Sequence, residues 1–342
     1  MAGAQSSLAK VVCFGELLLR LTAPGRELLL QTPRLDVHIG GAEANVAVGL
    51  ACLGHSTRVV SRVPNNALGE AAAGYLRRYG VDASTVSTAP GRMGLYFLSP
   101  GAGLRASEIV YDREGSSFAL ATAADYDWDC LLEGADLFHI SGITPALGPA
   151  SAELAVAAAE AAAARNVQIS FDGNYRAQLW QRWDSDPKAI LTRLVSKADI
   201  LFGNHRDISL LLGGSYGGEG EARRREAAEA AFAVFPKLRL IASTARHVVD
   251  ADTHRISARV DATDGSAQTE DVAVSGIIDR IGGGDAFAAG VLHGVLTRRD
   301  LDWTARSGLA LTALKHSLPG DASLFAPRDI EAFLTGELDV RR

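Results

Sequence analysis

The chain lacks a surplus of basic residues. Its 342 residues include 34 Lys and Arg against 40 Asp and Glu, which gives a net charge of −6. Binding to nucleic acid or to an acidic membrane surface requires positive charge to offset phosphate repulsion, so neither partner is expected. An anionic small molecule would instead have to be held by Arg or Lys side chains placed locally in a site.

Long apolar runs and cysteine pairs are also missing. The N-terminal segment MAGAQSSLAK has no apolar signal core, and no later run reaches the length of a membrane span. Cys13, Cys52 and Cys130 show no C-x-x-C spacing and stand among apolar residues. We therefore expect a cytoplasmic protein without a membrane partner, whose cysteines are buried free thiols in a reducing compartment.

Motifs of several common enzyme classes are absent or out of place. No G-x-x-x-x-G-K-[ST] sequence occurs, and no G-x-G-x-x-G follows the first predicted strand. Residues 213–217 (GGSYG) match G-x-S-x-G, but a helical run of leucines precedes them, whereas a hydrolase places this motif after a strand. The histidines show no metal-ligand spacing. A P-loop ATPase, a dinucleotide-dependent enzyme, an α/β-hydrolase and a transition-metal enzyme are therefore disfavoured.

What the chain does have is a regular alternation of strand-like and helix-like segments. Hydrophobic residues make up 47% and charged residues 22%, as in a globular protein with a sizeable core. Apolar strand patterns predict strands at residues 11–14, 57–63, 136–140, 167–172, 199–202 and 238–243. Helical periodicity predicts helices at residues 42–53, 68–79, 149–165, 187–197, 219–233, 285–298 and 302–317, most of which fall between or after these strands. This order predicts an α/β fold with a mostly parallel central sheet flanked by helices.

Two segments depart from this alternation. Residues 17–39 alternate weakly and contain turn-forming prolines and a glycine, and residues 93–111 are strand-like and rich in aromatic side chains. Both are predicted to form short antiparallel strands inserted into the α/β body. Because no internal repeat or clear linker is present, residues 10–336 are predicted to form a single domain with a small antiparallel β lid.

Residues 279–290 (DRIGGGDAFAAG) contain three consecutive glycines followed by an acid and a helix. Glycines let successive N–H groups point toward one place, and the start of a helix adds unpaired N–H groups. Gly282, Gly283 and Gly284 therefore predict a site for an anion such as a phosphoryl group. Asp285 would repel that anion as a ligand, but it is suited to take a proton from an attacking hydroxyl. The alternative is a glycine-rich turn in which Asp285 is an ordinary first-turn residue.

Polar residues also follow several predicted strands, at the edge of a parallel sheet where ligands bind. Residues 172–176 (DGNYR) combine an acid, an amide and a guanidinium, although a helix cap with a surface arginine explains them equally. Asn204 and Asp207 offer oxygen ligands for hydrated Mg²⁺ or, alternatively, begin a helix. Tyr96 and Tyr111 are either ligand contacts or aromatic residues on a sheet face.

Together these segments resemble the PfkB/ribokinase-like carbohydrate kinases over nearly the whole chain. The Gly-Gly-x-x-x-Asn sugar motif of that family is matched by residues 40–45 (GGAEAN), and its D-T-x-G-A-G-D-x-F signature by residues 279–287. Two positions of the signature differ, because Arg280 replaces the usual Thr and Gly283 the usual Ala. The family's N-x-x-E motif ends here in Asp207, and the shorter acid requires a further water between it and a metal ion.

Within the family the sequence is most similar to 2-keto-3-deoxygluconate (KDG) kinases, through the strings GGAEANVAV, GRMGLYFL, IVYDREGS, HISGITPAL, FDGNYRAQLW and LKHSLPGD. The resemblance implies a ribokinase-like fold and transfer of the ATP γ-phosphate to the C6 hydroxyl of KDG, with Mg²⁺ as the metal. Asp285 would be the base and Gly282, Gly283 and Gly284 the anion hole. The implied sugar contacts are Gly40, Gly41, Asn45, Tyr96, Tyr111, Arg113, Arg176, Asp285 and Asp321. The implied nucleotide contacts are Asn174, Asn204, Thr244, Gly282, Gly284 and Lys315, with Asp207 linked to the metal through water.

A substrate carboxylate needs a cationic partner, and two arginines are candidates. Arg113 in this acidic chain is expected to form a charge-assisted fork with the sugar acid, while Arg176 either does the same or neutralises the transferring phosphate. The lid is expected to close over the sugar and, by family analogy, to pair two chains into a homodimer. Two alternatives remain, namely a PfkB-type kinase for fructose, ribose or another deoxy sugar acid, and a non-catalytic sugar-sensing protein on the same fold.

Overall fold

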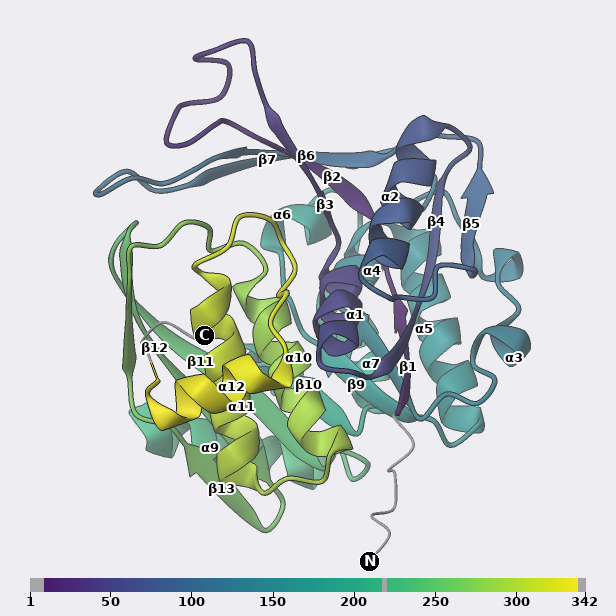
Figure 1. Cartoon of the computed structure of the whole chain (residues 1–342). Helices are drawn as coiled ribbons and strands as arrows, with labels where there is room; N and C mark the ends of the chain where they lie inside the picture. The colour runs from purple at the N-terminus through teal and green to yellow at the C-terminus, as the bar shows by residue number, and fades with distance from the viewer. Residues whose placement is uncertain (1–8, 217–219, 338–342) are drawn as a thin grey trace, which may run out of the picture.

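The computed structural model describes residues 9–216 and 220–337, and its body is a sheet with a small second sheet above it (Figure 1). The strand order of the main sheet is β13 (Gly265–Gln268), β12 (Thr253–Ala262), β11 (Leu240–Asp250), β10 (Ile200–Phe202), β9 (Gln168–Asp172), β8 (Leu137–Ser141), β1 (Lys10–Phe14), β4 (Ser56–Pro64) and β5 (Val86–Ala89). All pairs from β11 to β5 are parallel, whereas β12 is antiparallel to β11 and also pairs with β13 and β14 (Val272–Ser275). The predicted mostly parallel sheet is confirmed.

Helices cover both faces of this sheet, and β1 shows why its sequence is apolar throughout. Val11 and Cys13 belong to one core cluster, whereas Val12 and Phe14 belong to the other, because successive side chains point to opposite faces. The first cluster is completed by α1 (Ala42–Cys52), α2 (Ala67–Arg78), α10 (Gly283–Leu296), α11 (Leu301–Lys315) and α12 (Pro327–Thr335). The second is completed by α3 (Trp128–Leu131), α4 (Ile143–Ala146), α5 (Pro149–Ala164), α6 (Ala177–Trp180), α7 (Pro187–Val195), α8 (His205–Leu212) and α9 (Gly220–Val234).

The second sheet is the lid, and one part of its prediction is wrong. Its order is β3 (Asp36–Gly40), β2 (Leu18–Thr22), β6 (Gly94–Ser99) and β7 (Glu108–Asp112). The outer pairs are antiparallel as expected, but the central β2 and β6 are parallel, so the lid is mixed. The reason is that β2 follows β1 and β6 follows β5, and these two strands leave the main sheet in the same direction.

Two further expectations are changed by the structure. Cys13 is buried, but Cys52 is only partly buried and Cys130 is exposed, so the prediction of three buried thiols is wrong for two of them. Cys130 lies in the short α3, whose buried position is taken by Trp128. Gly213 ends α8 with a left-handed φ of 71°, so the formal G-x-S-x-G match begins at a helix C-cap, while its last residue lies outside the described residues.

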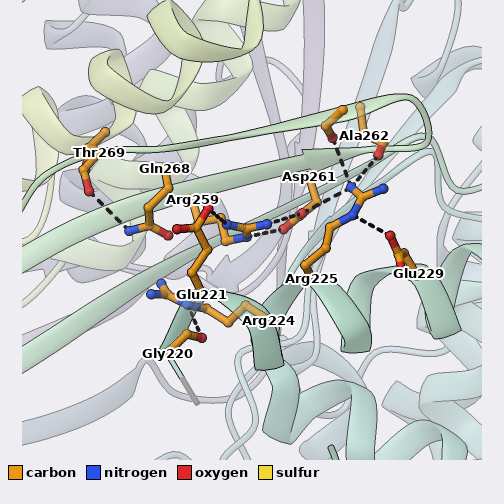
Figure 2. A network of polar contacts seen from close by, with 11 residues as sticks. Gly220, Glu221, Arg224, Arg225, Glu229, Arg259, Asp261, Ala262, Gln268 and Thr269 are labelled. Carbon is orange, nitrogen blue, oxygen red and sulfur yellow. Dashed lines mark hydrogen bonds and ion pairs between the residues drawn. The ribbon is translucent and has the colours of Figure 1, made fainter. Parts of the chain in front are cut away.

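A buried ion-pair network fastens α9 to the β12–β13 hairpin (Figure 2). Arg259 is 1% exposed and donates from Nε and Nη2 to the carboxylate of Asp261, at 2.7 and 2.8 Å, and from Nη1 to Glu221 at 2.8 Å. Arg225 of α9 also reaches Asp261 and the carbonyls of Ala262 and Gly265. Forked pairing offsets the desolvation of these charges. It therefore fixes β12, whose Ile256 lines the cleft described below.

Among the described residues, no helix combines the length and apolar character that crossing a membrane would require.

Candidate active site

The glycine turn, residues 279–284, leads into α10, whose first two residues are Gly283 and Gly284, and its shape requires glycine at position 282. Gly282 is the N-cap, with φ of 77°, and a Cβ there would overlap the backbone oxygen of Asp321. Asp279 pins the turn, since its Oδ1 accepts from the N–H of Ile281 at 2.9 Å and its Oδ2 from the N–H of Gly320 at 3.0 Å. A Cβ on Gly284 would meet nothing within 4 Å. This turn therefore leaves open space in front of a helix N-terminus, as the anion-hole prediction requires.

Asp285 stands in the first turn of α10 and faces the same space. Its Oδ2 accepts a hydrogen bond of 2.7 Å from Nδ2 of Asn45, which is buried in α1. The pKa of Asp285 is raised to about 7, mainly by burial and in addition by the carboxyls of Asp321 and Glu43, while the hydrogen bond from Asn45 opposes the shift. A carboxylate whose pKa lies near neutrality is suited to accept a proton during a reaction.

A cleft of about 960 Å³ opens between the lid, the strand ends and the glycine turn. Fifteen of the predicted site residues line it: Gly41, Asn45, Tyr96, Tyr111, Arg113, Asn174, Arg176, Asn204, Asp207, Thr244, Gly282, Gly283, Gly284, Asp285 and Asp321. They come from the lid, from the start of α1, from the segments that follow β9 and β10, from within β11, from the glycine turn and from the loop after α11. Residues predicted from separate segments therefore share one cavity.

The two remaining predicted residues do not line the cleft. Gly40 lies directly behind it, and a Cβ there would overlap the carboxylate of Asp321. Lys315 is 0% exposed, and its Nζ donates to the backbone oxygens of Leu318 at 3.0 Å and Asp279 at 3.4 Å. Burial lowers the pKa of Lys315, while nearby Asp279 and Asp321 oppose the shift. In the structure both residues support the wall of the site from behind.

Arg20 links the lid to the glycine turn. This β2 residue is 1% exposed, and its guanidinium lies 2.6 Å from Oδ2 of Asp279 and 3.0 Å from Oδ1 of Asp321. Tyr96 of β6 donates from its hydroxyl to Oδ2 of Asp321 at 2.5 Å. Burial raises the pKa of Asp321, and the guanidinium of Arg20 counteracts that rise. Arg20 thus connects the lid strand β2 to Asp279 and Asp321, the two carboxylates that contact the glycine turn.

At the lid end of the cleft, Arg113 already has an acidic partner. Its Nε and Nη2 donate to Oε2 of Glu16, at 2.8 and 2.5 Å, and both side chains are buried. Oε1 of Glu16 accepts from the hydroxyl of Ser116. Within the described chain, Nη1 of Arg113 makes no hydrogen bond. Arg176, in contrast, is exposed at the cleft and donates only to the neighbouring Tyr175 carbonyl. The Glu16 partner was not foreseen from the sequence.

Two further carboxyls, those of Asp172 and Asp207, line the cleft together with Asp285. The pKa of Asp172 is raised to about 8, mainly by burial and in addition by Asp285 and Asp207, while Arg176 opposes the rise. Burial also raises the pKa of Asp207. Asp207 and Asn204 form a capping box, in which Asp207 accepts from the Asn204 N–H at 2.7 Å, so the helix-start interpretation is confirmed. Both still line the cleft, although no group of three metal-ligating side chains occurs among the described residues.

Several cleft residues were not predicted as site residues, among them Arg246, Arg280, Thr312 and His316. Thr312 and His316 face Gly283 from α11 and its C-cap, and Oγ1 of Thr312 donates to the Gly283 carbonyl at 2.7 Å. Their spacing of four residues places them on one helix face, which is a signal that the sequence offers. Nothing in the local sequence, however, says which helix will pack against the turn.

Comparison with known proteins is consistent with this geometry. The sequence pattern described as "pfkB family carbohydrate kinase" matches residues 8–327. A 2-dehydro-3-deoxygalactonokinase of Haloferax volcanii is 29% identical over 332 residues, covering 96% of this chain and 97% of the relative. The crystal structure of a 2-dehydro-3-deoxygluconokinase from Thermotoga maritima is 36% identical, with a TM-score of 0.91, covering 96% of this chain and 99% of that one.

A more distant neighbour shows the same fold. A putative ribokinase from E. coli, in complex with ATP and Mg²⁺, has a TM-score of 0.79 and covers 96% of this chain and 100% of its own. Its identity of 20% shows the shared ribokinase-like fold alone. ATP and Mg²⁺ are therefore ligands of that related protein.

Proposed function

Because this chain belongs to the pfkB family of carbohydrate kinases, we propose that it transfers the γ-phosphate of ATP to the C6 hydroxyl of KDG. The observation that carries the proposal is Asp285, which is held by Asn45 at the mouth of the glycine turn, with its pKa raised to about 7. Similarity to sugar-acid kinases over almost the full length of the chain supports the substrate class.

In the proposed reaction, Asp285 accepts the proton of the C6 hydroxyl as its oxygen attacks the γ-phosphorus. The bond from the sugar oxygen to phosphorus forms, the bond to the bridging oxygen of ADP breaks, and Asp285 holds the proton. Among the described residues, the N–H groups of Gly284 and Asp285 make no hydrogen bond, so they remain available to the phosphoryl oxygens. Closure of the lid would exclude water as a competing acceptor.

Mg²⁺ fits the chemistry of the cleft at the acidic strand ends. This ion keeps several waters and binds through one or two carboxylates together with substrate phosphates. Asp207 and Asp172 provide carboxyls whose pKa values are raised by burial, and the charge of Asp207 adds to the rise at Asp172, a situation that a nearby cation relieves. Asp207 would hold the ion through water, and the ion would supply charge neutralisation for the phosphates.

A panel of acceptors tests the proposed substrate. We expect ADP release with KDG to exceed that with 2-keto-3-deoxygalactonate, fructose, ribose and gluconate. If another sugar gave a higher kcat/KM than KDG, that sugar would be the preferred substrate, and the chain would still act as a carbohydrate kinase of this family. Absence of ADP release with every acceptor would favour a sugar-sensing protein, although a sensor has no use for the proton acceptor at Asp285.

The substrate carboxylate is proposed to pair with Arg113, through Nη1, and with Arg176. Arg113→Met is then expected to raise KM for KDG about tenfold, because a hydrogen bond between charged groups is lost, with a smaller change for a neutral sugar. The double variant Glu16→Gln/Arg113→Met controls for the buried carboxylate that the single change leaves unpaired. An equal rise in KM for both sugars would exclude a role in carboxylate binding, and the same comparison with Arg176→Met separates the two arginines.

We further propose that two chains pair through their lids. The outer edges of β3 and β7 have no strand partner among the described residues, and Val37 and Val110 on them are 57% and 49% exposed. Unpaired edges with apolar side chains favour association. Light scattering is expected to give the mass of a dimer for the natural chain and a lower mass for Val37→Glu; a monomeric mass for the natural chain would contradict the proposal.

A further inference from the structure

Two arginines that line the cleft have no role in the reaction as described. Arg246 extends from β11, two residues beyond Thr244, and Arg280 precedes Gly282 by two residues. Among the described residues, no carboxylate oxygen lies within 4.0 Å of either guanidinium, whereas Arg113 in the same cleft is paired with Glu16.

The two guanidiniums are close enough to repel one another. Burial lowers the pKa of Arg246, and the charge of Arg280 lowers it further. His254 lies beside them, and its pKa is lowered to about 4 by burial, then by Arg246, His316 and Arg280. The rings of His254 and His316 are 5.8 Å apart. This part of the cleft therefore carries positive charge that no carboxylate of the described residues neutralises through an ion pair.

The same cleft is also lined by four carboxyl groups, those of Asp172, Asp207, Asp285 and Asp321. An anion that enters this cavity is repelled by these carboxyl groups where they are ionised and attracted by the two arginines. Gly284, whose N–H group makes no hydrogen bond among the described residues, follows Arg280 in the same turn and lines the same cleft. A polyphosphate with its terminal phosphoryl group at the glycine turn matches this distribution of charge.

We propose that Arg246 and Arg280 bind the non-transferred phosphates of the nucleotide donor. The inference rests on the proposed function, in which a nucleoside triphosphate is the donor. Each guanidinium presents a planar fork of N–H donors that suits two phosphate oxygens, and the phosphates relieve the repulsion between the two cations. Arg280, which departs from the family signature, would then increase the affinity for the nucleotide donor.

Calorimetric titration with ADP and with AMP, in Mg²⁺ buffer at fixed ionic strength, tests this inference. Arg246→Met and Arg280→Met are each expected to weaken ADP binding by about tenfold or more, as expected for hydrogen bonds to a charged group. AMP binding should change less than threefold, and KM for the sugar should stay the same. Arg239→Met, an exposed arginine at the opposite end of β11, is the matched control and should leave ADP binding unchanged.

The outcomes separate this inference from the proposed function. Unchanged ADP affinity in both variants, with ADP bound normally by the natural chain, overturns the inference alone. Equal losses for ADP and AMP also overturn it, because they indicate contact with the nucleoside. Weaker binding of the sugar acid with unchanged ADP affinity shows that the arginines serve the acceptor, and overturns it too. Absence of ADP binding by the natural chain overturns the nucleotide donor and this inference with it.

Discussion

Asp285→Asn is expected to lower kcat by on the order of 10²-fold or more, with KM for the sugar within a few-fold of the natural value. The amide keeps the size of the carboxyl and faces the same Asn45 side chain, but it cannot accept the hydroxyl proton. Removing the negative charge also removes repulsion toward phosphate, so nucleotide binding should not weaken. Initial rates of ADP release at saturating sugar measure the effect, and near-natural turnover by a folded variant would remove Asp285 from the mechanism.

The pH dependence of the natural enzyme provides an independent readout of the same residue. A base must be ionised to act, and Asp285 has a pKa of about 7. We therefore expect kcat/KM to fall about tenfold per pH unit below that value and to level off above it. Asp264→Asn, which changes an exposed acid in the β12–β13 turn, should retain both the rate and the pH profile. A flat profile between pH 5 and 8 would contradict the assignment.

Much of this site was predictable because its parts are encoded locally. Gly282 must be glycine for a reason that lies in its own backbone conformation, and Asp285 follows at a fixed distance in the first helical turn. Likewise, the uninterrupted apolar run of β1 predicts a strand buried on both faces without reference to its neighbours. Asn45 was predicted from a motif, and the structure adds that it donates to Asp285 from 240 positions away.

The features that escaped prediction depend on partners distant in sequence. Arg113 was expected to pair with a substrate carboxylate, but its Nε and Nη2 already donate to Glu16, which lies 97 positions earlier in the chain. Lys315 belongs to a string shared with KDG kinases, and its amino group nevertheless points at backbone oxygens behind the turn. The parallel pairing of β2 with β6 is set by where each strand leaves the main sheet. Local sequence patterns do not predict such contacts, because neither of the two contacting segments has an unusual sequence by itself.

Arg20→Met is expected to lower the free energy of unfolding by about 3 to 5 kcal/mol, the cost of leaving buried charge partners unpaired. The variant keeps the apolar stem of the side chain but leaves the carboxylates of Asp279 and Asp321 without their guanidinium. Because Asp279 also pins the glycine turn, kcat should fall as well. Arg26→Met is the matched control, since Arg26 pairs with Asp252 at the surface and its loss should cost at most about 1 kcal/mol. Urea unfolding followed by circular dichroism measures both variants.

The stability loss caused by Arg20→Met should also depend on pH in a definite direction. The guanidinium holds down the pKa of Asp321, which burial raises, so its removal moves the pKa in the folded variant further above the ordinary value. Between the pKa of Asp321 in the unfolded chain and its higher pKa in the folded variant, the folded variant binds a proton that the unfolded chain does not. The stability of the variant relative to the natural protein therefore falls as pH rises through this range. Acidification should protonate the unpaired carboxyl and recover part of the loss. A deficit that is independent of pH, or no larger than that of Arg26→Met, would show that the Arg20 ion pairs do not hold the lid to the turn.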